Sequence, residues 1–327
     1  MRLKGRVAYT ASEPIARAPS LSGETRSEPT PENPDMVSAP SLPTGSLPAA
    51  SAPDRRGRRV QAVVNYLGPM DTRPVFYAQN YAANHLNLVP TVVEVEDFRG
   101  HEASTSLEVE GFRLMQHVSE VNDFRDSAKV NAVYVPEVAA LIGELTGASK
   151  VLVNGPVLRW GERAPHPEHI NSRPGRFAHV DYSLDGFHAF ARNHLAGDPE
   201  ADHWLAGRYA AFNLWRVLTP PPQDIPLGVV DARTAHRNQV TEGDAVIDIP
   251  GRPEFRFGSS LFHADPAHRW AYFSDMDRDE VLVFKAFDSD LSKVQGCPHS
   301  AFDDPTCPAG AIPRSSIEIR AFAFWGN

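Results

Sequence analysis

The sequence has little cysteine and no long apolar run. Two cysteines among 327 residues exclude a disulfide-stapled scaffold and fit a reducing compartment, so we expect a cytoplasmic protein. No stretch approaches the roughly 20 apolar residues of a membrane helix, so we expect no association with a membrane. Residues 1–18 contain basic side chains without an apolar stretch, a pattern that argues against a secretory signal peptide.

Basic residues are also in the minority. Lys and Arg number 32 against 41 Asp and Glu, which leaves a net charge of −9. Residues 1–59 carry +3 and the rest of the chain carries −12. A body this acidic repels phosphate backbones, so nucleic acid is not an expected partner.

An apolar period is missing from residues 1–58. Proline recurs every few residues between Ser27 and Asp54, and aromatic residues are almost absent there. Such a segment cannot bury enough surface to offset the entropy lost on ordering. We therefore predict a disordered Pro/Ser-rich tail over 1–58 and a single domain over 59–327.

Short runs of β-branched and aromatic residues begin at Val60 and continue to the C-terminal region, separated by turn residues. These runs are typical of strands. A helical period is confined to a few segments, chiefly 127–145, 185–196 and 199–206. Many strands with few helices predict a β-rich α+β domain, a barrel or sandwich with helices packed outside it.

The segment HVDYS contains the most informative pair of side chains. His179 and Asp181 are two residues apart, so on a strand they project from the same face. One imidazole and one carboxylate supply two corners of a metal site. Two histidines and one carboxylate form a facial triad that holds Fe(II) and leaves further positions open. The pair alone occurs by chance in many proteins, so a third ligand must come from elsewhere.

The C-terminal region offers that ligand and a possible anion site. His299 is a candidate third corner, and a polar strand face follows it. If Ile317 and Ile319 on the opposite face pack against outer helices, the polar face points inward, where a buried arginine needs an anion. Alternatively, the arginines lie at the surface or pair with glutamate. The polar face contains Arg314, Ser316, Glu318 and Arg320.

Other residues compete for these roles. Arg216, in the strand-like run NLWRVL, is a candidate second anion contact for cosubstrate or substrate. His263 or His268 could replace His299 as the third metal ligand. Neither, however, is followed at a suitable distance by an R-x-S motif such as Arg314-Ser315-Ser316. Cys297 lies two residues before His299, a spacing that is also compatible with zinc, but too few soft ligands accompany it.

Taken together, the motifs resemble the Fe(II)/2-oxoglutarate-dependent dioxygenases, and within them the hydroxylase/desaturase family of secondary metabolism. That family includes the cephamycin methoxylation partner protein, gibberellin desaturase-like proteins and fungal endoperoxidases. The resemblance covers about Val60 to Trp325. It depends on the segments HVDYS, NLWRVL, VLVFKAFDSD, PHSAFDDP and PRSSIEIRAFAFW.

The resemblance implies a double-stranded β-helix and an oxygenase that uses Fe(II), 2-oxoglutarate and O2 on a small-molecule natural product. It implies that Arg314 and Ser316 hold the distal carboxylate of 2-oxoglutarate. Arg320 could hold either carboxylate or pair with Glu318. The implied iron ligands are His179, Asp181 and His299.

Two other functions are weighed against this one. A non-catalytic partner of a biosynthetic enzyme could share the fold, although the intact metal motif argues against it. A metal-dependent hydrolase on a similar barrel would have no use for R-x-S. A homodimer and a complex with a biosynthetic partner enzyme are both compatible with the sequence. The substrate, and the choice between hydroxylation, desaturation and endoperoxidation, depend on how the substrate is positioned.

Overall fold

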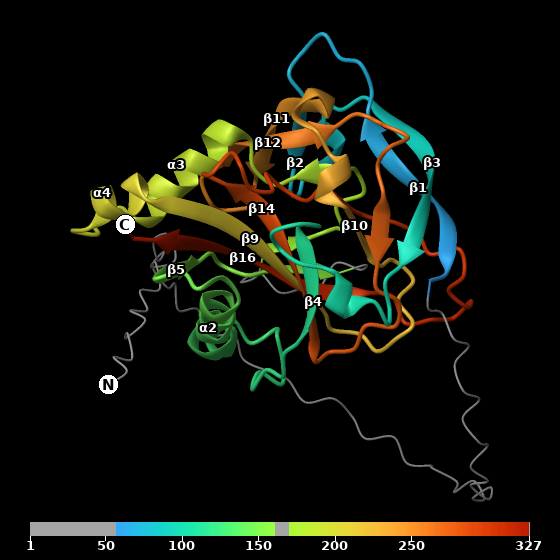
Figure 1. Ribbon diagram of the computed structural model, residues 1–327. Coiled ribbons are helices and arrows are strands. Elements are labelled where there is room, and N and C mark those ends of the chain that lie inside the picture. Colours follow the sequence, from blue (N-terminus) through green and yellow to red (C-terminus); the bar gives the residue numbers. More distant parts are fainter. Residues whose placement is uncertain (1–56, 161–169, 327) are drawn as a thin grey trace, which may run out of the picture. The chain divides into compact units, whose positions relative to one another are not determined.

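The computed structural model describes residues 57–160 and 170–326. These residues belong to one compact unit, in which two curved sheets face each other (Figure 1). The predicted tail over 1–58 lies almost entirely outside the described residues and stays a prediction. No helix among the described residues is long and apolar enough to cross a membrane.

The first sheet brings together strands from distant parts of the sequence. Its order is β1-β3-β13-β10-β15-β8-β12-β11-β2, so β8 and β15 are neighbours although more than a hundred residues separate them in the sequence. Its strands are β1 (Arg59–Leu67), β2 (Val75–Tyr77), β3 (Leu88–Asp97), β8 (His179–Val180), β10 (Leu227–Val230), β11 (Val240–Ile247), β12 (Phe255–Phe262), β13 (Trp270–Tyr272) and β15 (His299–Ala301).

The second sheet contains β16, the longest strand among the described residues. Its order is β4-β14-β9-β16-β6-β7, and β5 also pairs with β16. The strands are β4 (Phe112–Gln116), β5 (Lys150–Val153), β6 (Val157–Trp160), β7 (Ile170–Ser172), β9 (Arg208–Val217), β14 (Glu280–Asp288) and β16 (Ser315–Trp325).

The helices pack on different faces of the second sheet: α2 covers one face, and α3 packs on the other, where Phe187 meets Phe322 of β16. Helix α2 ends at Gly147, whose φ of 67° suits glycine because it has no Cβ. A π-helical turn, Val130–Tyr134, leads into it. The helices are α1 (Ser127–Lys129), α2 (Val135–Thr146), α3 (Leu184–His194) and α4 (Ala201–Ala206).

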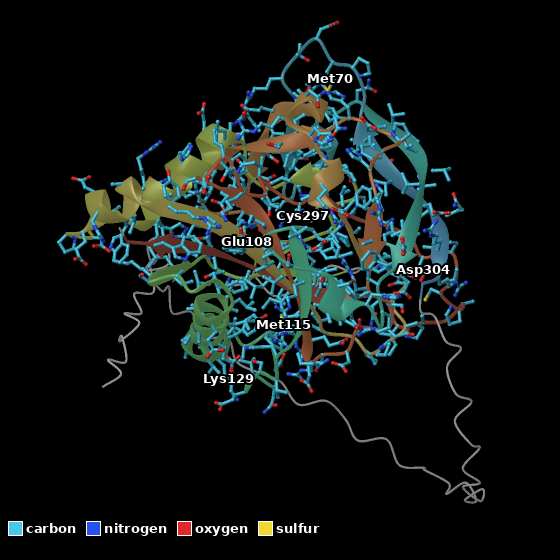
Figure 2. The ribbon with its side chains drawn as sticks, in the orientation of Figure 1. Met70, Glu108, Met115, Lys129, Cys297 and Asp304 are labelled. Carbon is cyan, nitrogen blue, oxygen red and sulfur yellow. The ribbon has the colours of Figure 1, made fainter. Side chains whose placement is uncertain are left out.

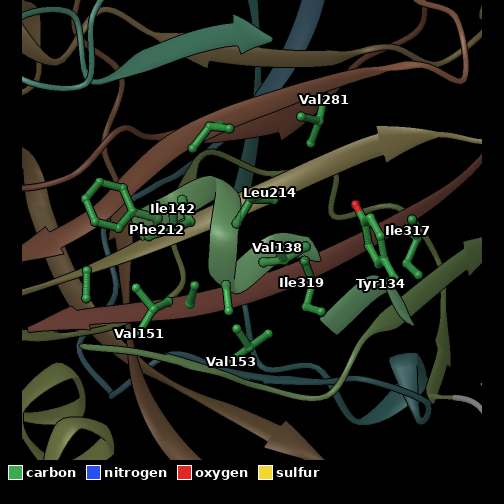
Figure 3. Close-up of a cluster of buried hydrophobic side chains, with 14 of the residues drawn as sticks. Tyr134, Val138, Ile142, Val151, Val153, Phe212, Leu214, Val281, Ile317 and Ile319 are labelled. Carbon is green, nitrogen blue, oxygen red and sulfur yellow. The ribbon is translucent and has the colours of Figure 1, made fainter. Parts of the chain in front are cut away.

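Helix α2 packs against the outer face of β9 and β16. Val138 and Ile142 of the helix meet the isoleucines of β16, as Figure 3 shows. Because side chains alternate along a strand, the residues between those isoleucines point the other way, toward the first sheet. Ile317 and Ile319 thus mark the outside, as the sequence predicted, and the polar residues of β16 face the interior.

Side chains from both sheets meet in this interior. Phe284 of β14 packs on His299 of β15, with 4.7 Å between ring centroids. Arg320 of β16 bonds to Asp181, which directly follows β8. Two facing sheets with helices packed against them make up a β-rich α+β fold with a double-stranded β-helix core, which confirms the expected fold class.

Candidate active site

Two histidines lie side by side where β8 and β15 pair. His179 and His299 occupy directly opposite positions in the register, and their ring centroids are 4.4 Å apart. The Nδ1 of His179 donates to the carbonyl of Phe177 at 2.8 Å, and the Nδ1 of His299 donates to that of Cys297 at 3.3 Å. Each Nε2 therefore keeps its lone pair for a metal ion.

Asp181 completes a three-residue group. Its Oδ1 lies 3.7 Å from the Nε2 of His179, and the potential ligand atoms of Asp181 and both histidines lie within 4.8 Å of one another. All three residues are buried. Among the described residues, this is the one group of at least three His, Cys, Asp or Glu side chains close enough to share a metal ion. Its donor set is that of the Fe(II) facial triad.

The electrostatics of the site favour metal binding. Burial, with a smaller effect of neighbouring His299, lowers the pKa of His179 to about 4. Burial also lowers the pKa of His299. For Asp181, burial alone would raise the pKa, but Arg320 and the histidines hold it well below its usual range. Near neutral pH the site thus offers two neutral imidazoles and one carboxylate, the protonation state that a metal ion requires.

A buried ionic network surrounds Asp181. Arg320 donates from Nε to Oδ2 at 2.8 Å and from Nη2 to Oδ1 at 2.9 Å, and Asn213 of β9 donates to Oδ2. Nη2 of Arg320 also lies 2.6 Å from Oε1 of Glu318. Nε of Arg159, on β6, donates to the other oxygen of Glu318 at 3.0 Å. Arg320 therefore pairs with Glu318, which is one of the two roles that the sequence left open for it.

Arg314, just before β16, has a different environment. Its side chain is almost completely buried, at 2% exposure, yet Nε, Nη1 and Nη2 have no hydrogen-bond partner. The neighbouring hydroxyl of Ser316 and the indole Nε1 of Trp215 are also buried without a partner. Burial and nearby Arg159 lower the pKa of Arg314 to about 9, so it is still a cation at neutral pH.

These unpartnered donors lie near the metal-ligating group. The guanidinium of Arg314 is 5.4 Å from the centroid of the Trp215 ring. Trp215 is opposite Glu318 in the β9–β16 register, and Asn213 is opposite Arg320. Glu318 and Arg320 belong to the network around Asp181, and Ser316 and then Arg314 follow on the same interior face.

The donor set fits a dicarboxylate cosubstrate. A buried arginine without an anion is unfavourable, because its charge has lost water and gained no acceptor. A carboxylate placed between Arg314 and Ser316 would provide that acceptor through charge-assisted hydrogen bonds. The residues thus fit both groups that the family resemblance implied, an iron ion at the triad and the distal carboxylate of 2-oxoglutarate at Arg314.

Arg216 does not face this site. It lies on the outer face of β9, where its Nε donates to the hydroxyl of Tyr134 at 3.3 Å and its Nη1 donates to the carbonyl of His117 at 2.9 Å. Its Nη1 also donates to the carbonyl of Arg278. The expectation of an anion contact at Arg216 therefore needs correction: the side chain has the opposite strand parity from Asn213 and Trp215, and protein acceptors already satisfy it.

The alternative metal ligands are occupied elsewhere. His263 bonds to the hydroxyl of Thr241 and to the carbonyl of Leu67. His268 bonds to Tyr66 and Gln239. Each uses both ring nitrogens within the protein, so neither competes with His299.

The zinc alternative at Cys297 also lacks support. Its thiol is buried in the interior (Figure 2) and donates to the carbonyl of Val230. Burial raises the pKa of this thiol well above its usual value. Because a metal binds the thiolate, Cys297 is a poor ligand in this position.

Arg159 escaped the sequence analysis. It meets Glu318 across the β6–β16 pairing although 159 positions separate the two residues. Trp215 and Asn213 belong to the same strand-like run as Arg216, and the sequence does not show which of its residues face the interior. In β9 almost every residue is buried, so no alternation of polar and apolar residues distinguishes its two faces.

Comparisons with known proteins agree with this geometry. The family model described as "Oxidoreductase/YMDC permease-like domain" matches residues 64–324. Hydroxylase/desaturase CTB9 of Cercospora beticola is 31% identical over 251 residues, covering 71% of this chain and 76% of the relative. Fe(II)/2-oxoglutarate-dependent dioxygenase nvfI of Aspergillus novofumigatus is 29% identical over 256 residues, covering 74% and 86%.

A solved structure is similar over nearly its whole length. The iron and alpha-ketoglutarate-dependent endoperoxidase NvfI superposes with a TM-score of 0.72 at 25% identity, covering 83% of this chain and 99% of the other. These named relatives are catalysts, so the comparisons give no support to the non-catalytic alternative. The chain belongs to the hydroxylase/desaturase family of Fe(II)/2-oxoglutarate-dependent dioxygenases, enzymes that use Fe(II), 2-oxoglutarate and O2.

Proposed function

We propose that this protein hydroxylates or desaturates a small-molecule natural product, with Fe(II) held by His179, Asp181 and His299. The proposal is supported by the donor set: two imidazoles with their Nε2 lone pairs available and one ionised carboxylate, all buried and within reach of one ion. When bound, the iron together with 2-oxoglutarate and O2 supplies the oxidising power that breaks a C–H bond of the substrate.

The observation that carries the proposal is the unpartnered Arg314. Three buried guanidinium nitrogens, together with the hydroxyl of Ser316, form a site for one carboxylate that no acceptor among the described residues fills. We assign this site to the distal carboxylate of 2-oxoglutarate. Arg314 would fix the cosubstrate by a planar, charge-assisted contact, and Ser316 would add one neutral donor.

The protein's own contribution is positioning and exclusion of water. Aromatic rings pack around the histidines: Phe177 lies 4.8 Å from His179, and Phe284 lies 4.7 Å from His299, measured between ring centroids. These rings limit the movement of the imidazoles and keep the side of the triad formed by the two histidines apolar. Electrostatic contacts are stronger in such a water-poor site.

The test uses the full chain, purified without oxygen. Titration of 2-oxoglutarate into the Fe(II)-loaded protein should produce a metal-to-ligand charge-transfer band in the visible region. On admission of O2 and a substrate drawn from the products of neighbouring biosynthetic genes, the protein should form succinate in step with substrate oxidation. Absence of the band in wild-type protein would overturn the assignment of both the metal and the cosubstrate site.

The proposal also covers the cellular compartment of the protein and its oligomeric state. The two cysteines in the sequence fit a reducing compartment, so we place the enzyme in the cytoplasm. There it would act as a homodimer or beside a biosynthetic partner enzyme. Sedimentation of the purified chain, alone and mixed with enzymes encoded by neighbouring genes, measures both.

A further inference from the structure

We propose that Arg320 is a positioning residue for the metal centre: it holds the carboxylate of Asp181 so that only Oδ1 is presented to the metal. This inference rests on the proposed function, because it concerns how the triad holds its ion. It changes the role expected for Arg320 from a cosubstrate contact to a residue that acts through a ligand.

The two oxygens of Asp181 are engaged unequally. Oδ2 accepts from Nε of Arg320 at 2.8 Å and also from Asn213, so both of its lone pairs are used. Oδ1 accepts a single hydrogen bond, from Nη2 of Arg320 at 2.9 Å. It is also the oxygen that lies 3.7 Å from Nε2 of His179. The remaining lone pair of Oδ1 is thus the free acceptor site of this carboxylate, and it belongs to the oxygen nearer the histidines.

Arg320 is itself held in place. Its Nη2 forms an ion pair with Oε1 of Glu318 at 2.6 Å, and Arg159 donates to the other oxygen of Glu318 at 3.0 Å. Glu318 is only 4% exposed. An arginine with a carboxylate on each side has little freedom to rotate, so it can impose one orientation on Asp181.

The orientation of Asp181 would determine how many coordination positions of the metal ion stay open to other ligands. A carboxylate free to rotate can bind a metal through both oxygens and so occupy two positions. With Oδ2 saturated, Asp181 occupies one, and the triad as a whole occupies three. The remaining positions stay open for the cosubstrate and oxygen.

The test variant is Arg320→Lys, which keeps the positive charge but cannot make the two parallel hydrogen bonds. We expect its Fe(II) Kd, measured by anaerobic calorimetry on the apoprotein, to rise about 10–100-fold, the usual effect of losing a residue that orients a ligand. With Co(II) as probe, the visible d–d bands should also change shape, because the coordination of Asp181 changes.

Arg208→Lys is the matched control. Arg208 makes the same two-pronged contact with Asp288, at 3.1 and 2.6 Å, and Asp288 belongs to no metal-ligating group among the described residues. This variant should change stability but leave the Fe(II) Kd and the Co(II) bands unchanged. A purely structural role of Arg320 would make the two variants alike.

Asn213→Ala is a second variant in case Arg320→Lys does not fold. It removes the other donor to Oδ2 and should raise the Fe(II) Kd severalfold. An unchanged Fe(II) Kd and unchanged Co(II) bands in folded Arg320→Lys, or in Asn213→Ala if the first variant is unfolded, would overturn the inference. Failure of wild-type protein to bind Fe(II) would instead overturn the proposed function, so the two failures are distinguishable.

Discussion

Arg314 and Arg216 are both buried arginines, at 2% and 0% exposure; Arg216 lies on β9, and Arg314 directly precedes the neighbouring strand β16. Arg216 donates to two backbone carbonyls and to a tyrosine. Arg314 has no hydrogen-bond partner for any side-chain nitrogen. Burial therefore does not reveal what an arginine is for. The hydrogen-bond acceptors around each arginine distinguish the two: Arg216 has acceptors within the folded chain, and Arg314 has donors left for a ligand.

Strand parity produces this difference. On β9, Arg216 points toward the helix-covered side, where Tyr134 and the chain before α2 provide acceptors. Trp215, the residue before it, points toward the first sheet and lies under Arg314. A change of one position along a strand thus separates a residue that supports the fold from one that faces the site.

Arg314→Ala should have the largest effect on ligand binding. Loss of the guanidinium leaves one end of 2-oxoglutarate unpaired in a buried site, which should weaken binding by about 2–5 kcal/mol, or roughly 30-fold to several thousand-fold in Kd. Because the variant removes a buried charge that lacks an acceptor, the apoprotein should not lose stability. Titration of the charge-transfer band measures the first effect, and urea unfolding measures the second.

Arg314→Lys is the matching control, since it keeps the charge without the planar fork and should restore binding only in part. An unchanged titration in Arg314→Ala would remove the anion site from this position and, with it, the contrast between the two arginines.

Arg216→Ala should show the opposite pattern. It leaves two partly buried carbonyls and a buried tyrosine hydroxyl without their donor, so the free energy of unfolding should fall by about 2–5 kcal/mol. The Kd for 2-oxoglutarate of the folded fraction should stay unchanged, because Arg216 faces away from the site. A large rise in that Kd at unchanged stability would mean that Arg216 contacts the cosubstrate after all.

Ser316→Ala and Trp215→Phe should have smaller effects. Each removes one neutral donor, and the second keeps an aromatic ring beneath Arg314. We expect a weakening of about 1 kcal/mol for each, or about fivefold in the Kd for 2-oxoglutarate. An equally small effect for Arg314→Ala in the same titration would show that charge does not dominate binding here.

The smallest effect concerns pH. Burial lowers the pKa of His194, on α3, to about 4, as it does for His179. Unfolded histidine binds its proton near pH 6.5, so acid favours the unfolded state: stability should be full above about pH 6.5 and fall as the pH drops toward 4. Each such histidine should contribute a loss of about 1 kcal/mol by pH 6.

His194→Phe tests the same comparison among histidines. The variant should flatten the decline of the urea midpoint between pH 7.5 and 5 and leave Fe(II) binding unchanged, because His194 is not part of the metal-ligating group. Stability that is constant or rises on acidification would contradict the neutral, buried state of these imidazoles.

The sequence predicted the parts of the site that a single strand determines. His179 and Asp181 are two residues apart, which predicted that their side chains lie side by side. The isoleucines of β16 indicated which face of that strand points to the interior. The sequence could not decide the facing of Arg216, because β9 is buried on both sides. Nor could it pair Arg320 with Asp181, 139 positions earlier, since that contact arises only when the two sheets face each other.

The pairing of β8 with β15 has a mechanical consequence. The boundary between β8 and β15 divides the first sheet into five strands that end with β15 and four that begin with β8. The single register pair that joins β8 to β15 is His179 with His299. An ion bound by both imidazole rings would link β8 to β15 and so hold the two parts of the sheet together. Occupancy of the centre and the continuity of the sheet would then be coupled, with backbone amides along this boundary opening less often in the loaded protein than in the empty one.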